Sequence, residues 1–209
     1  MIAIVDYGVG NLFSLNCSFK AIGEEAVVTS DPETLKKAEK IVLPGVGAFA
    51  DAAAKLRASG LEEILKEETA NGKPLLGICL GMQLLLDSSE EYGNHKGLGL
   101  IKGTNRSIGE VIPEEYKIPH MGWNELLYCG EKHPLFRHLG EHEYVYFVHS
   151  FAGFDCGENT IAVTDYGADI TAAVAKKNVM GTQFHPEKSG ETGLKILKAF
   201  CELKEEELC

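Results

Sequence analysis

The first 79 residues alternate between short apolar runs and longer amphipathic segments, and this alternation restricts the fold more than any other feature. Strands are predicted at residues 2–5, 25–29, 40–43 and 73–79, and helices at residues 11–22, 30–38, 48–60 and 61–72. Strands that alternate with helices form right-handed βαβ units in a mostly parallel sheet. We therefore expect an α/β fold with a doubly wound sheet, helices on both faces, and ligands at the carboxyl ends of the strands.

The second half of the chain has a different pattern, with short β-like runs separated by Gly, Asn and Asp. These runs cover residues 97–101, 144–151, 160–166 and 170–175. They predict antiparallel strands added to the parallel sheet. The chain then ends with a strand, a His-Pro-Glu turn and a closing helix whose Leu194, Leu197 and Phe200 should point inward. Because no low-complexity linker divides the sequence, residues 1–209 are expected to form a single domain.

Composition excludes several classes of protein. The chain has 20 lysines and arginines against 31 aspartates and glutamates, a net charge of −11, which argues against binding nucleic acid or an anionic membrane. None of its six cysteines forms a CxxC pair or a zinc-type cluster with histidine, so no metal is expected. With neither a signal peptide nor a long apolar run, the expected location is the cytoplasm.

The segment "GICLG", residues 77–81, has the G-x-C-x-G form of a nucleophile elbow with a thiol. At such an elbow a strand bends sharply into a helix and exposes the central residue, here Cys79, while Gly77 and Gly81 leave room for the bend. The helix would favour the thiolate, and the N–H of Leu80 would stabilise an oxyanion. A buried strand–turn–helix with a packing cysteine would explain the same five residues.

A nucleophilic cysteine needs a base, and His185 in "GTQFHPEKSG" is the best-placed histidine. Pro186 favours extended geometry at His185, and in extended backbone residues i and i+2 point the same way. Glu187 can then accept the proton of one ring nitrogen and leave the other nitrogen facing Cys79. The alternative is a strand-end histidine held by a backbone carbonyl.

The loop "LPGVGAF", residues 43–49, is the third candidate component. Gly45 and Gly47 allow backbone conformations that other residues avoid, so their N–H groups could approach a substrate and complete an oxyanion hole. Rotation of the Gly45–Val46 peptide would exchange a carbonyl for an N–H and could gate activity. An ordinary structural turn remains an equally good interpretation of this loop taken alone.

Together, "LPGVGAF", "GICLGMQ" and "GTQFHPEKSG" resemble the class I, triad-type glutamine amidotransferases over nearly the whole chain. The resemblance implies that Cys79 attacks the side-chain amide of glutamine, giving a glutamyl thioester and ammonia. His185 would then transfer protons and Glu187 would orient it, with no cofactor. By the same resemblance, the oxyanion hole comprises Val46, Gly47 and Leu80, and the glutamine pocket comprises Gly47, Gln83, Glu91, Ser150 and Phe151.

Three further segments, "MIAIVDYGVGNLFSL", "IPHMGWNEL" and "YFVHSF", resemble the branch of this family that works in histidine biosynthesis. That resemblance implies a heterodimer with a (β/α)8 cyclase subunit that receives the ammonia. It also places six residues on or near the contact with that subunit: Asn11, Ser14, His120, Trp123, Tyr146 and Lys188. Separately, the chain has no nucleotide-binding motif for a second reaction, which favours an acceptor site on another chain.

Several alternatives stay open at this point. Trp123 could lie in the core or at an interface, and the same two positions are open for Met121. Asn11 could simply cap the first helix. The acceptor could belong to another amidotransferase, such as the one serving pyridoxal phosphate synthesis. A non-catalytic relative that uses the elbow cysteine as an oxidation switch is a third hypothesis, although His185 and Glu187 argue against it.

Overall fold

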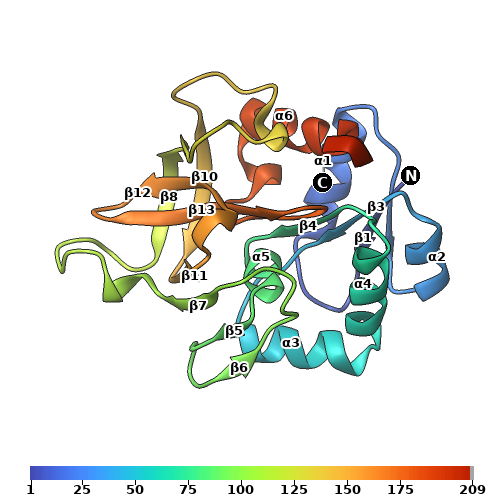
Figure 1. Ribbon diagram of the computed structural model, residues 1–209, viewed down its shortest axis with the longest axis horizontal. Helices are drawn as coiled ribbons and strands as arrows, with labels where there is room; N and C mark the ends of the chain where they lie inside the picture. The colour runs from blue at the N-terminus through green and yellow to red at the C-terminus, as the bar shows by residue number, and fades with distance from the viewer. Residues whose placement is uncertain (208–209) are drawn as a thin grey trace.

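A computed structural model describes residues 1–207, so Leu208 and Cys209 of the acidic tail lie outside the described residues. Its largest feature is an eight-stranded sheet in the order β2-β1-β3-β4-β14-β13-β12-β9 (Figure 1). The parallel part contains β1 (Ile2–Val5), β2 (Ala26–Thr29), β3 (Lys40–Leu43), β4 (Leu75–Ile78) and β14 (Val179–Thr182). The antiparallel part contains β13 (Asp169–Lys176), β12 (Thr160–Asp165) and β9 (Leu127–Tyr128). The predicted mostly parallel α/β architecture is confirmed.

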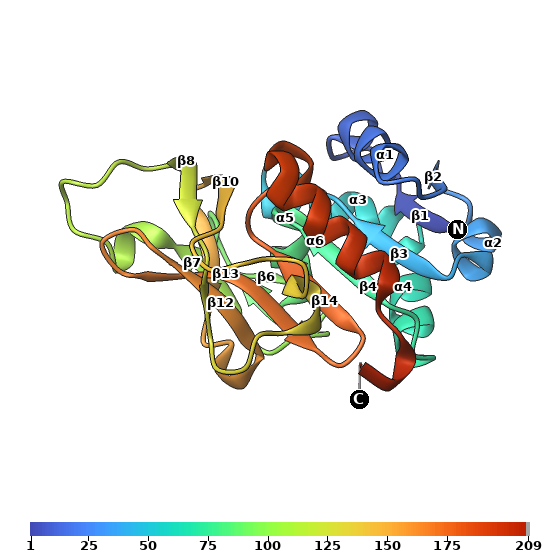
Figure 2. The same ribbon diagram turned by 90° about the horizontal axis from the view of Figure 1, so that it is seen from above.

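Helices cover both faces of the parallel part (Figure 2). One face carries α1 (Leu12–Ala21) and α6 (Gly190–Glu202), and the other carries α2 (Pro32–Lys37), α3 (Phe49–Ala58), α4 (Leu61–Ala70) and α5 (Leu80–Leu85). Successive strand residues supply the two cores: Ile4 packs with the α1 and α6 side, and Val5 with the other. Because side chains alternate along a strand, a four-residue strand that is apolar throughout is buried on both faces.

Local signals explain where several helices begin and end. Asp31 precedes α2 and its side chain accepts a hydrogen bond from the Thr34 N–H at 2.9 Å, as an N-cap does, with Pro32 at the first helical position. In α6, Leu197 and Phe200 are fully buried as predicted, whereas Leu194 is only half-buried. The sequence pattern thus predicted this helix correctly and overstated the burial of one side chain.

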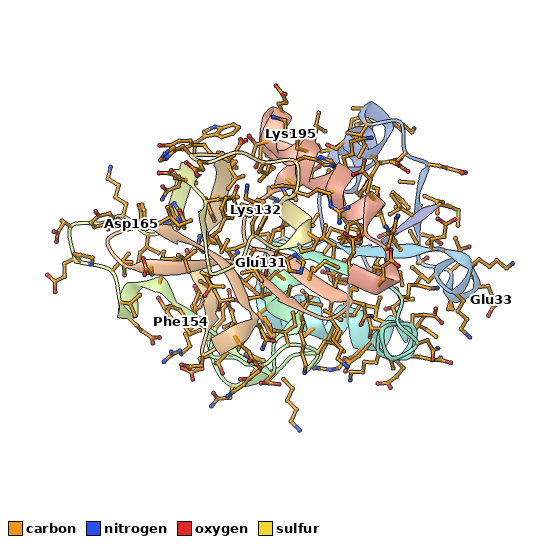
Figure 3. The ribbon with its side chains drawn as sticks, turned by 45° about the horizontal axis from the view of Figure 1, so that its top comes forward. Glu33, Glu131, Lys132, Phe154, Asp165 and Lys195 are labelled. Atoms are coloured by element: carbon orange, nitrogen blue, oxygen red, sulfur yellow. The ribbon has the colours of Figure 1, made fainter. Side chains whose placement is uncertain are left out.

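The antiparallel region extends beyond the main sheet into two smaller sheets. One pairs β8 (His120–Glu125) with β10 (Tyr144–His149), and the other has the order β11-β7-β5-β6. Its strands are β11 (Phe151–Phe154), β7 (Thr104–Ser107), β5 (Ser88–Ser89) and β6 (His95–Lys96). Short 3-10 turns are η1 (Ile108–Glu110), η2 (Pro134–Phe136), η3 (Gly157–Asn159), η4 (Pro186–Lys188) and η5 (Glu205–Glu207). In Figure 3, Asp165 at the end of β12 lies at the opposite end of the molecule from Glu33 on α2.

Two strand predictions in this region were wrong. Residues 97–101 form a loop, because the N–H groups of Leu98, Leu100 and Ile101 bond the carbonyls of Leu84 and Leu85 at 2.8–3.0 Å and so complete the end of α5. Residues 144–151 do not form one strand: the chain leaves β10 at Ser150 and enters β11 in a different sheet. This change of sheet puts the break between the strands at the wall of a cavity.

None of the helices within residues 1–207 has the length and apolar character needed to cross a membrane. Across the same residues, no group of three or more His, Cys, Asp or Glu is arranged to hold a metal ion. The described cysteines are free, with Cys79 and Cys156 buried and Cys17 exposed.

Backbone segments pack very closely where β4 meets α5. A Cβ built on Gly81 would lie 1.9 Å from the Leu43 carbonyl oxygen, and a Cβ on Gly77 would lie 2.7 Å from the Gly81 carbonyl oxygen. Real Cβ atoms do not approach backbone this closely, so only glycine lets α5 begin against the neighbouring strand. The two glycines of the predicted elbow are therefore required by packing.

We expect Gly81→Ala to destabilise the protein by at least about 2 kcal/mol, because overpacking a filled site costs about 1–3 kcal/mol and the obstacle here is backbone. Urea unfolding followed by circular dichroism measures the change. Gly140→Ala is the matched control, since its Cβ would meet nothing nearer than 3.7 Å. Equal stability of the two variants would contradict this account of the elbow.

Candidate active site

Cys79 occupies a sharp bend between β4 and α5. Its backbone has φ 54° and ψ −112°, a left-handed conformation that costs a residue with a Cβ about 1–3 kcal/mol. Two backbone bonds hold it: the Cys79 N–H donates to the Thr182 carbonyl at 2.7 Å, and the Cys79 carbonyl accepts from the Gln83 N–H at 3.2 Å. The predicted strand-to-helix bend is therefore present, and Cys79 is 7% exposed at its apex.

His185 and Glu187 form an ion pair beside this bend. Because β14 pairs in parallel with β4, Gln183 and Cys79 follow the carboxyl ends of neighbouring strands, and His185 comes two residues later. Its Nδ1 lies 2.8 Å from Glu187 Oε1, so Nδ1 carries the hydrogen and Nε2 is left for the sulfur. The other carboxylate oxygen, Glu187 Oε2, is buried and has no hydrogen-bond partner within residues 1–207, so the carboxylate bonds His185 alone.

The surroundings of His185 change its proton affinity. Burial alone lowers the pKa, but hydrogen bonds and charge from Cys79 and Glu187 outweigh it and raise the pKa of His185 to about 9. The stability that protonated His185 contributes is therefore present below its ordinary pKa of 6.5 and is lost as pH rises through about 9. A protonated imidazole beside the sulfur is thus available across the neutral range.

A cavity of about 370 Å³ opens over Cys79 and His185. Its lining includes every residue that was predicted for the oxyanion hole and the glutamine pocket, namely Val46, Gly47, Leu80, Gln83, Glu91, Ser150 and Phe151. These residues come from the loop after β3, from α5, from the segment after β5, and from the break between β10 and β11. The fold brings them together although they are spread over more than 100 positions of the sequence.

Glutamine side chains connect this cavity to the nucleophile. Gln83 Nε2 donates to the Phe151 carbonyl at 2.9 Å and to Gln183 Oε1 at 3.1 Å. Gln183 Nε2 in turn lies 3.8 Å from Cys79 Sγ. Gln183 is fully buried and was missed by the sequence analysis. The available signal was its place in "TQFHPE", at the same strand edge as the histidine.

Glu91 lines the cavity but also has a structural contact. Its Oε2 accepts the Phe49 N–H at 2.8 Å and so caps the first turn of α3. The carboxylate is 9% exposed. Its position is thereby fixed at the cavity rim, with Oε1 remaining for a cationic group of a ligand.

The loop after β3 is fixed by a residue that the sequence analysis also missed. The Tyr7 hydroxyl donates to the Pro44 carbonyl at 2.7 Å, and burial raises the pKa of Tyr7, so it stays a donor. Gly47 has φ +95°, a conformation that favours glycine. At Gly45 a Cβ would lie 2.8 Å from the Gly81 nitrogen, which shows that the loop packs directly against the start of α5.

The residues predicted for a partner contact fall into two groups. Trp123 is 56% exposed and Met121 61%, so both side chains are on the surface and not in the core. Tyr146 lies beside Trp123, with 6.2 Å between ring centroids, and Lys188 Nζ lies 6.0 Å from the Tyr146 ring centroid. These four residues form one face on β8, β10 and η4.

The other predicted contact residues differ. His120 is only 2% exposed, so its side chain is interior and cannot belong to that face; alternation along β8 turns it inward while its neighbour Met121 points out. Asn11 and Ser14 are half-buried near the start of α1. Asn11 occupies the N-cap position, but its side chain makes no capping hydrogen bond within residues 1–207. The helix-cap interpretation of Asn11 was therefore wrong.

The sequence of this chain is similar to those of known proteins. The family model for glutamine amidotransferase class-I matches residues 3–203. A subunit HisH of imidazole glycerol phosphate synthase from Sulfurimonas denitrificans is 52% identical over 202 residues, covering 96% of this chain and 97% of its own. The subunit of the same name from Methanothermobacter thermautotrophicus is 50% identical over 203 residues, covering 97% and 98%.

Solved structures agree on the fold. A glutamine amidotransferase crystal structure superposes with a TM-score of 0.74 at 17% identity, covering 96% of this chain and all of that one. The PurLQS structure from Thermotoga maritima gives 0.73 at 21% identity, with 96% of each chain covered. These two likenesses concern the fold alone. The family model and the HisH relatives go further: this chain belongs to the class I glutamine amidotransferases and, within them, to the family of imidazole glycerol phosphate synthase subunit HisH.

Proposed function

We propose that this chain hydrolyses glutamine to glutamate and ammonia with Cys79, His185 and Glu187, as the glutaminase subunit of an imidazole glycerol phosphate synthase. One observation carries the proposal: a cysteine with a left-handed backbone and His185, which is paired with the buried carboxylate of Glu187, open onto the same cavity. Family membership supports the same activity. Because a free thiol is the nucleophile, a reducing cytoplasm is the setting that we propose.

In the first half of the proposed reaction, the proton of the Cys79 thiol is held on His185 Nε2, and Cys79 Sγ attacks the amide carbon of the glutamine side chain as a thiolate. The N–H of Leu80, one of the first N–H groups of α5 without a partner in the helix, holds the oxyanion together with the Val46–Gly47 backbone. Protonated His185 then gives its Nε2 proton to the amide nitrogen. The carbon–nitrogen bond breaks, ammonia leaves, and a glutamyl thioester remains on Cys79.

In the second half, His185 acts as a base. Its Nε2 takes a proton from water, the hydroxide attacks the thioester carbon, and the carbon–sulfur bond breaks to release glutamate. Glu187 keeps the imidazole in one orientation through the 2.8 Å bond to Nδ1. Glu91 and the Ser150–Phe151 backbone would hold the α-ammonium and α-carboxylate ends of glutamine.

The ammonia has a proposed destination on another chain. The curated relatives are each named a subunit, which supports a partner for this protein. We infer that the partner is the (β/α)8 cyclase subunit, which would add ammonia to a phosphoribulosyl-formimino aminoimidazole carboxamide ribonucleotide. The products would be imidazole glycerol phosphate and aminoimidazole carboxamide ribonucleotide. The exposed face around Trp123, Tyr146 and Lys188 supports this contact, since exposed aromatic residues of this kind are enriched at interfaces.

We expect Cys79→Ala to abolish glutamine hydrolysis by the complex, because no other group can form the thioester. An assay of glutamate release measures this, and labelling with a glutamine-like electrophile followed by mass spectrometry should modify Cys79 alone. Cys17→Ala, at an exposed free cysteine, is the control and should keep both activity and labelling. Turnover by the Cys79→Ala protein would exclude the proposed nucleophile.

We expect Glu187→Gln to lower the activity and to move the alkaline limb of the pH–rate profile downward. The carboxylate helps to raise the pKa of His185 to about 9, so without its charge His185 loses its proton at lower pH. The measurement is kcat for glutamine hydrolysis between pH 6 and pH 10. An unchanged alkaline limb would show that Glu187 does not tune His185.

We expect the isolated chain to be nearly inactive and the cyclase complex, loaded with its nucleotide substrate, to be active. The reason is the glycine on each side of Val46, which permits the Gly45–Val46 peptide to rotate and complete the oxyanion hole only when a partner is bound. Glutaminase assays with the chain alone, with the cyclase, and with both cyclase and nucleotide separate the cases. Full activity of the chain alone would refute this gating.

A further inference from the structure

The proposed mechanism does not use two buried histidines, of which His149 lies in the cavity wall and His120 lies beside it, outside the cavity lining. His149, the last residue of β10, is 6% exposed and its Nδ1 lies 2.8 Å from the Phe151 carbonyl oxygen. A carbonyl oxygen only accepts, so Nδ1 carries the hydrogen of this bond. In a neutral ring the other nitrogen, Nε2, is then an acceptor.

The second histidine satisfies that acceptor. His120 Nδ1 lies 3.1 Å from His149 Nε2, so His120 donates from Nδ1 and its own Nε2 becomes an acceptor. Asn124 Nδ2 lies 3.3 Å from that nitrogen, and the same amide donates to the Asp165 carbonyl at 2.8 Å. Every hydrogen in the chain from Asn124 to Phe151 therefore points in one direction, which assigns one tautomer to each ring.

The packing keeps both rings neutral and still. The His120 ring stacks between Phe147 and Tyr166, with centroids 4.7 Å and 4.0 Å away. Burial lowers the pKa of His120 to about 4. Burial also lowers the pKa of His149 to about 3, although the hydrogen bond to the Phe151 carbonyl opposes this effect. Neutral rings are what the directed hydrogen bonds require.

The chain ends at a part of the wall that is fixed from several sides. The Phe151 carbonyl accepts from Gln83 Nε2 as well as from His149, so both of its lone pairs are used. The Ser150 carbonyl accepts the Ile108 N–H at 3.0 Å. His149, Ser150 and Phe151 all line the cavity over Cys79. The wall lies where β10 ends and β11 begins, so the ladder on each side of Ser150 belongs to a different sheet and no single ladder runs through it.

We propose that His120 and His149 are a positioning pair that fixes the Ser150–Phe151 wall and thereby sets the affinity of the site for glutamine. The inference rests on the proposed function, because it concerns the same cavity. Besides the pairing of Phe151 with Ser107 in β7 and the Ser150–Ile108 backbone bond, two side-chain hydrogen bonds hold this wall, one from Gln83 and one from His149. Loss of the His120–His149 bond leaves the His149 ring free to turn, and the Phe151 carbonyl loses a fixed donor.

The test uses glutamine binding to full-length protein that carries Cys79→Ala, in complex with its partner and measured by calorimetry. His120→Phe keeps a flat ring between Phe147 and Tyr166 but removes the donor to His149. We expect it to weaken glutamine binding about fivefold to tenfold, the loss that one neutral hydrogen bond predicts. His120→Asn, whose amide can replace Nδ1 as a donor, should recover most of the affinity.

Kinetics of the same His120 variants with Cys79 intact separate positioning from general damage. We expect KM for glutamine to rise about fivefold to tenfold while kcat stays within about twofold, because the triad is untouched. His138→Phe is the matched control, since His138 is exposed and bonds Glu202 on α6, and its KM should equal that of the parent. A fall in kcat with unchanged KM would overturn the proposal.

Further outcomes also decide the question. Parental affinity in His120→Phe would overturn the proposal, because ring shape and not the hydrogen bond would then matter. Equal losses in His120→Phe and His120→Asn would also overturn it, because restoring a donor would then recover no affinity. If His120→Phe does not fold, His149→Asn and His149→Leu replace it. The asparagine amide keeps a donor for the Phe151 carbonyl, so the His149→Asn protein should bind glutamine more tightly than the His149→Leu protein. Failure of the Cys79→Ala parent to bind glutamine would instead count against the proposed function.

Discussion

The site depends on one constraint, the close approach of α5 to the sheet at Gly77 and Gly81. Because the backbone of α5 begins almost in contact with Leu43, the chain must turn within a single residue after β4, and Cys79 takes the left-handed conformation that such a turn imposes. Pairing of β4 with β14 on one side and the first turn of α5 on the other hold that conformation. The thiol is therefore presented at the strand edge by backbone geometry.

The same strand pairing brings the other catalytic groups into place. Since β14 runs parallel to β4, the residues that follow it reach the same edge, and the turn of η4 returns Glu187 to the imidazole of His185. Burial by itself would lower the pKa of His185, but the Glu187 carboxylate and the Cys79 sulfur reverse that effect. The buried His185 thus keeps its proton only because the Glu187 carboxylate and the Cys79 sulfur, which are buried with it, stabilise its charge.

Sequence patterns predicted the parts of this protein in which local chemistry decides the structure. The apolar runs identified β1, β3 and β4, Asp31-Pro32 identified the start of α2, and the glycines around Cys79 identified the elbow. Contacts made by tertiary packing gave no such signal. Gln183 and His149 look like ordinary strand residues, and the run at 97–101 looked like a strand because nothing local shows that its N–H groups would be taken by α5.

Strand β8 shows how one element can serve the surface and the cavity together. Its alternation turns Met121 and Trp123 outward and His120 and Asn124 inward, so residues on the exposed face are one position from the chain of bonds that ends at Phe151. Successive side chains of a strand point to opposite faces but share one backbone. A partner seated on the Trp123 face would thus hold the same backbone that carries His120, which links partner binding to the glutamine site through covalent geometry.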